Sequence, residues 1–129
     1  MRILSFDTSS SSVHLSLLAS PGAPGDARLH AAVERVIAPA SADRLEVASL
    51  IYPGIDTALR DAGWSKHDLS LIVVGTGPGS FTGIRVAVIV ARTLCQTLKL
   101  PLLGISSLEA YGFAAGTPCA VVLSAGSAH

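Results

Sequence analysis

The stretch VVGTGPGSFTGIR, residues 73–85, decides how this chain folds. It begins with a short apolar run that is typical of a buried central strand. A glycine-rich turn follows, in which three alternate residues permit close backbone approaches that a Cβ would prevent: Gly75, Gly77 and Gly79. Ser80 or Thr82 can then cap a helix. The stretch therefore predicts a strand, a tight turn and the start of a helix.

Two interpretations of this turn stay open. Backbone N–H groups that point outward at a helix N-terminus can bind an anion such as a phosphate. However, the turn lacks the Gly-Lys-Ser/Thr ending of a P-loop, and its glycine spacing is not that of a dinucleotide-binding motif. A tight strand-to-helix turn that binds no ligand is the simpler interpretation.

The string GPGSFTGIR, residues 77–85, resembles the signature of the bacterial TsaB family, also called YeaZ. Two other segments are similar to that family and occur in the same order, ILSFDT at 3–8 and LLGISSL at 102–108. One motif departs from the family, because Val47, Ala48 and Ser49 stand roughly where relatives carry His-Ser-x-x. The resemblance covers essentially the whole chain.

The resemblance implies a non-catalytic or weakly catalytic accessory subunit, with no catalytic residue assigned, for the threonylcarbamoylation of the tRNA adenosine next to the anticodon. Its partner would be the catalytic TsaD homologue, with association of a TsaE-type ATPase, and the subunit would form a homodimer when alone. The tRNA would be contacted only indirectly. No cofactor is implied, apart from weak binding of ATP or ADP with Mg at a partner interface.

The resemblance also implies an α/β fold of the actin-like ATPase or RNase H-like type, with a mixed five-stranded sheet and helices on both faces. Residues 1–117 would form the actin-like N-terminal domain, and residues 118–129 a C-terminal tail or the start of a truncated second domain. Three strands would be antiparallel and two parallel, centred near Ile3, Val13, Leu29, Leu71 and Leu102. The strand near Leu29 rests on the resemblance, because its pattern would also suit a helical turn.

Composition agrees with a single α/β domain. Half of the 129 residues are apolar and 14% are charged, as expected for a sheet with covered faces. Nine basic and nine acidic residues give a formal net charge of zero, so the sequence shows no basic surface for nucleic acid. If RNA is involved, a partner is expected to hold it.

Cysteine and histidine spacings indicate neither a zinc site nor a redox pair. Cys95 and Cys119 are far apart, and none of the four histidines stands at metal-binding spacing, so a metallopeptidase has the least support. The chain has no apolar run of 18 or more residues and no leader-like N-terminus. We expect a cytoplasmic protein without a membrane partner.

The end of the first predicted strand carries the second functional hypothesis. Asp7, Thr8 and the serines after them resemble the first phosphate loop of actin-like folds, in which the aspartate helps to organise metal and phosphate. With the turn from Gly75 to Ser80, they would form a vestigial phosphate loop in a nucleotide-binding kinase or ATPase lobe. The alternative is a polar hairpin turn in which Asp7 accepts hydrogen bonds from neighbouring backbone. Apart from Asp7, these loops offer no metal ligand or base for phosphoryl transfer.

Two long helices are predicted. The first begins after Ser41 and runs toward Leu59, with a kink or local break expected at Pro53-Gly54. The second runs from about Thr82 to Leu98, and one narrow stripe at helical spacing contains Arg85, Ile89, Arg92, Gln96 and Lys99. A core helix with a solvated strip would explain this stripe, but we favour a surface that a partner helix covers. The predicted partner contact comprises Leu50, Ile51, Arg85, Ile89 and Arg92.

Overall fold

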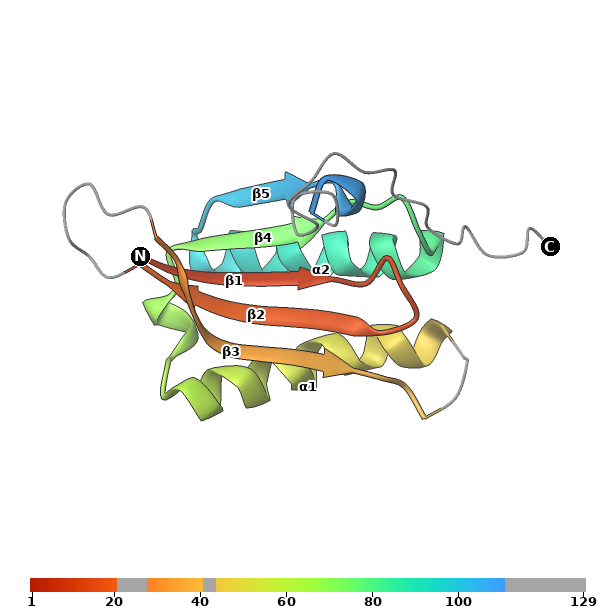
Figure 1. The fold of residues 1–129 in the computed structure, drawn as a ribbon. Coiled ribbons are helices and arrows are strands. Elements are labelled where there is room, and N and C mark those ends of the chain that lie inside the picture. The colour runs from red at the N-terminus through yellow and green to blue at the C-terminus, as the bar shows by residue number, and fades with distance from the viewer. Residues whose placement is uncertain (21–27, 41–43, 111–129) are drawn as a thin grey trace.

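The computed structural model describes residues 1–20, 28–40 and 44–110. Along the chain, these residues form β1 (Arg2–Asp7), β2 (Val13–Ala19), β3 (His30–Ile37), α1 (Arg44–Ala62), the short 3-10 helix η1 (Lys66–Asp68), β4 (Leu71–Gly75), α2 (Phe81–Leu98) and β5 (Leu102–Ile105) (Figure 1). The expected cap Ser41, the cysteine Cys119 and the expected second-domain segment 118–129 lie outside the described residues.

The five strands form one mixed sheet in the order β3-β2-β1-β4-β5. β1 and β3 both pair antiparallel with β2, while β4 pairs parallel with β1 and with β5. In the central row, Phe6 pairs with Leu15 on one side and with Val74 on the other. The predicted mixed sheet of three antiparallel and two parallel strands is therefore confirmed, including the third strand that the residue pattern left ambiguous.

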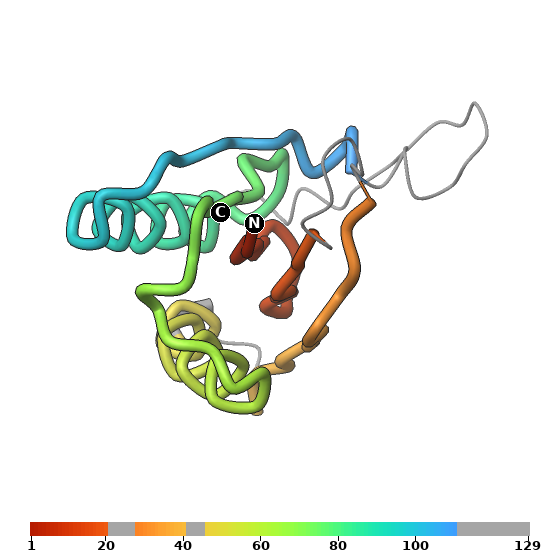
Figure 2. Tube along the Cα trace, turned by 90° about the vertical axis from the view of Figure 1, so that its left-hand side faces the viewer, coloured from red at the N-terminus to blue at the C-terminus, as the bar shows by residue number. Residues whose placement is uncertain are grey.

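Both long helices lie on the same face of this sheet. α1 packs on β2 and β3, α2 packs on β4, and the two helices contact each other. Figure 2 shows them side by side within the curve of the sheet. The core between the layers is built from alternate strand residues, among them Leu4, Phe6, Leu17 and Ile72.

Helices were expected on both faces of the sheet, but α1 and α2 cover only one of them. The connections from β3 to β4 and from β4 to β5 each move in the same direction across the sheet. Right-handed crossovers that move in one direction place their helices on one face. A further helical turn begins at Ser107 and extends to residue 110, the last that the structure describes.

A kink or a local break was predicted at Pro53 and Gly54. The break is wrong, because α1 continues through both residues. Pro53 is exposed on the outer side of the helix, while Gly54 is buried against β3. A Cβ at Gly54 would lie 2.5 Å from Cδ1 of Ile37. The glycine therefore allows the helix to approach the edge strand closely at this position.

α2 is long and apolar enough to cross a membrane by length and composition. In this fold it is an amphipathic core helix, because Ala87, Ala91 and Leu94 are buried on one side. The opposite side is exposed along most of the helix.

Replacing Ile51 with alanine should destabilise the domain by about 3 kcal/mol, because its side chain is fully buried and the truncation leaves a cavity. Ile89→Ala is the matched control in the other helix, and its 58% exposed side chain should cost under about 0.5 kcal/mol. Urea unfolding followed by circular dichroism measures both. Equal losses would contradict the packing described here.

Candidate functional site

The end of β1 and the glycine-rich turn after β4 pack directly on each other. A Cβ added at Gly75 would overlap the carboxylate of Asp7, and one at Gly79 would overlap the backbone of Ser9. Real Cβ atoms do not approach other atoms so closely, so both positions require glycine. Gly75 therefore makes room for the Asp7 side chain, and Gly79 allows a close approach to the backbone of Ser9.

The first turn of α2 is joined to the same segment. The Thr8 hydroxyl is buried and donates a hydrogen bond of 2.7 Å to the carbonyl oxygen of Gly83. A Cβ at Gly83 would lie 2.5 Å from the Thr8 carbonyl oxygen. Ser80 caps the helix, because its side chain accepts a hydrogen bond from the Gly83 N–H. The prediction of a helix start at this position is confirmed.

The Asp7 carboxylate is held by protein donors on both oxygens. Its Oδ1 accepts hydrogen bonds from the backbone N–H of Ser9 at 2.7 Å and from the Ser9 hydroxyl at 2.5 Å. Its Oδ2 accepts a 2.5 Å hydrogen bond from the hydroxyl of Ser107, which is itself buried. These contacts match the polar hairpin turn, the alternative to a phosphate loop in the sequence analysis.

The N–H groups of the glycine-rich turn are also used within the protein. The N–H of Thr76 donates to Ile105 O (2.9 Å), and that of Gly77 donates to Ser107 Oγ (3.2 Å). The N–H of Ser80 donates to Ser9 O (2.9 Å). A phosphate-binding turn needs such groups free and pointing outward. Among the side chains described, no cluster of three or more His, Cys, Asp or Glu residues is arranged to hold a metal ion.

The exposed side of α2 carries the second group of predicted site residues. Phe81 and Ile89 are 71% and 58% exposed, and Arg85 and Arg92 are exposed beside them. The guanidinium carbon of Arg85 lies 5.2 Å from the centre of the Phe81 ring, a cation-π contact. We call Phe81, Arg85, Ile89 and Arg92 the α2 stripe.

Phe81 was not among the predicted contact residues, because it was assigned only to the glycine-rich signature. Its spacing of four residues from Arg85 is the signal that places it on the same side of the helix.

The predicted contribution of α1 to the partner contact needs a correction. Ile51 is 0% exposed and belongs to the core cluster, so it cannot touch a partner directly. Leu50 is half-buried and packs against that core. The large exposed side chain at this position of α1 is Tyr52, at 55%, which was absent from the predicted contact.

A family model described as "TsaD: tRNA N6-adenosine threonylcarbamoyltransferase" matches residues 28–129, which include the glycine-rich turn and both helices. The "tRNA threonylcarbamoyladenosine biosynthesis protein TsaB" of Bacillus subtilis is 46% identical over 57 residues, 44% of this chain. The chain belongs to the TsaB/YeaZ family. The match covers 25% of the Bacillus subtilis TsaB.

One solved structure agrees with the family and the fold, and a second agrees with the fold alone. "YeaZ from Pseudomonas aeruginosa" superposes with a TM-score of 0.67 and 29% identity, over 88% of this chain and 48% of that one. RuvC from Thermus thermophilus, at 11% identity, shares the fold alone, with a TM-score of 0.61 over 90% of this chain and 70% of that one. The predicted actin-like or RNase H-like fold is confirmed, and the chain spans about half the length of the solved YeaZ.

Gly83→Ala should lower the free energy of unfolding by about 2 kcal/mol, because the new methyl group meets the fixed backbone oxygen of Thr8. Gly54→Ala is the matched control inside a helix, where the obstacle is only the mobile end of the Ile37 side chain. Its loss should be smaller, since a better helix propensity offsets part of the crowding. Urea denaturation gives both values, and a neutral Gly83→Ala would contradict the contact.

Asp7→Asn should destabilise the fold by about 1–3 kcal/mol, because an amide nitrogen replaces one acceptor of the partly buried network. Asp56→Asn, in an exposed i,i+4 ion pair with Arg60, should cost less than about 1 kcal/mol.

Calorimetry with Mg-ATP should show no binding to the unmodified chain. Heat that disappears in Asp7→Asn while stability is unchanged would instead assign Asp7 to a nucleotide site.

Proposed function

We propose that this chain is an accessory subunit for the formation of threonylcarbamoyladenosine in tRNA and acts by pairing, through the α2 stripe, with a TsaD homologue. The observation that carries this proposal is the exposure of two large apolar side chains, Phe81 and Ile89, on a helix whose other side is core. The names of the relatives supply the pathway.

The physical chemistry of the stripe suits a helix-to-helix contact. Fully burying a Phe or Ile side chain contributes roughly 1.5–3 kcal/mol each, so a partner that covers both gains substantially. Arg85 and Arg92 flank Ile89 at helical spacing, and arginine is enriched in protein interfaces. The contact between Arg85 and Phe81 already orders two members of the stripe before binding.

The net charge of the chain supports a model in which the partner, and not this chain, contacts the tRNA. Its formal net charge is zero, and nucleic-acid surfaces are generally basic, so contact with tRNA is assigned to the TsaD homologue. In the same proposal, the stripe pairs two copies when the partner is absent, a TsaE-type ATPase joins the assembled pair, and the assembly is cytoplasmic.

The alternative, a nucleotide-binding kinase or ATPase lobe, draws less support from the geometry. Asp7 accepts hydrogen bonds from Ser9 and Ser107, and N–H groups of the glycine-rich turn donate within the protein. A phosphate and its metal would have to displace these internal contacts. Weak binding of ATP or ADP with Mg at the partner interface would use a different site, which these internal hydrogen bonds do not occupy.

Ile89→Asp should abolish the complex with a TsaD homologue from the same source, because it places a charge at the centre of the stripe while Ile89 contributes nothing to the core. Thr97→Asp, an exposed position on another side of α2, should leave the complex intact. Light scattering on a sizing column measures the complex, and circular dichroism confirms folding. A stoichiometric complex with Ile89→Asp would refute the proposed contact.

A further inference from the structure

A hollow of about 290 Å³ lies between the C-terminal halves of α1 and α2, away from the glycine-rich turn. Its floor is apolar and is formed by the buried or half-buried side chains of Leu4, Ile55, Leu59, Leu69, Leu94 and Leu98. Its rim consists of more exposed residues of α1 and of the segment around η1: Tyr52, Asp56, Arg60, Trp64, Ser65 and Lys66. An apolar floor with a few polar groups at the edge is the usual composition of a binding pocket.

The polar groups of the rim are unbalanced in favour of hydrogen-bond donors and positive charge. Asp56 and Arg60 form an ion pair with each other at 2.5 Å. That leaves the Lys66 ammonium, which has no ion-pair partner within residues 1–20, 28–40 and 44–110. Tyr52 and Trp64 add a hydroxyl and an indole N–H, for which the same residues offer no acceptor. The rim therefore suits a ligand that supplies acceptors and negative charge.

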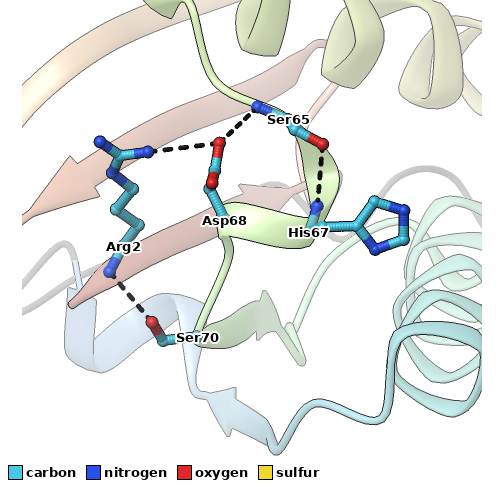
Figure 3. Close-up of polar contacts among 5 residues, drawn as sticks. All are labelled: Arg2, Ser65, His67, Asp68 and Ser70. Carbon is cyan, nitrogen blue, oxygen red and sulfur yellow. Dashed lines mark hydrogen bonds and ion pairs between the residues drawn. The ribbon is translucent and has the colours of Figure 1, made fainter.

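The wall that carries Trp64 and Lys66 is held in place by its own contacts. Arg2 lies over the Trp64 ring, with its guanidinium carbon 4.7 Å from the ring centre, and its Nη1 is 3.3 Å from Oδ2 of Asp68. The same carboxylate accepts a 2.7 Å hydrogen bond from the N–H of Ser65, and Ser70 accepts one from the N–H of Arg2 (Figure 3). A wall fixed in this way loses little conformational freedom when a ligand binds.

We propose that this hollow binds an acidic peptide segment by taking up one of its apolar side chains. The apolar floor accepts a leucine-sized side chain, and carboxylates on either side of it meet Lys66 and the hydroxyl of Tyr52. A volume of about 290 Å³ has room for one apolar side chain together with the flanking backbone of a peptide. The proposal does not depend on pairing through the α2 stripe.

Trp64 is the only tryptophan of the chain, so its fluorescence reports directly on the hollow. The probe is an acetylated and amidated Glu-Glu-Leu-Glu-Glu peptide without aromatic residues, titrated into the full chain at low salt. We expect a saturable change in emission that weakens as salt is added, because exposed charges are screened. A glycine-centred peptide of the same charge should bind at least about tenfold more weakly, since it cannot fill the floor.

Lys66→Glu should weaken binding of the leucine peptide at least about fivefold, because it reverses the unpaired charge at the rim. Lys99→Glu, at the only other lysine of the chain, lies outside the hollow and should leave the affinity unchanged. Both positions are exposed, and circular dichroism checks that both variants fold.

The Ile89→Asp variant separates this proposal from the proposed function. It should bind the peptide like the unmodified chain even though it no longer pairs through the α2 stripe. Absence of a saturable signal in both proteins would overturn the peptide site. So would equal affinity for the glycine-centred peptide, or an unchanged affinity in Lys66→Glu.

Discussion

The fold depends on the close approach between the end of β1 and the glycine-rich turn after β4. Asp7 and Ser9 occupy the space that side chains would need at Gly75 and Gly79, while the backbone of Thr8 closes against Gly83. This contact sets how β1, β4 and the first turn of α2 meet. The buried Ser107 extends it to the end of β5, because its hydroxyl bonds both Asp7 and the N–H of Gly77. Four segments are fixed by one small polar network.

The signature therefore divides its residues between two tasks. Gly79, Ser80 and Gly83 face inward, where they complete the network and cap the helix. Phe81 and Arg85 alternate with them and face outward on the α2 stripe. One short string can hold a strand end to a helix and also present a surface, because successive residues at a helix start point in different directions. A glycine-rich sequence at such a turn is therefore not by itself evidence of a bound ligand.

Pattern and turn chemistry predicted four of the five strands, both long helices and a cap at Ser80 or Thr82, since short-range sequence determines these features. The third strand rested on the family resemblance. It could not predict that both helices lie on one face, which follows from the direction of two crossovers and hence from strand order. The predicted break at Pro53 is wrong for a similar reason, because the packing of Gly54 on β3 supports the helix there. Ile51 was misplaced by one residue, and the neighbouring Tyr52 is the exposed side chain. Such an error of one position turns a side chain by about 100° around the helix.

The hydrogen bond between Asp7 and Ser107 spans 100 residues of chain. A nascent chain on the ribosome cannot close it until nearly the whole described domain has been synthesised. Oδ1 of Asp7 can already bond Ser9 in the hairpin of β1 and β2, but Oδ2 still lacks its partner. The long loop also makes closure of this network a late and entropically costly step, which favours cooperative completion of the domain over stepwise growth. The side chain that holds Asp7 Oδ2 is thus synthesised only after all the strands of the described sheet.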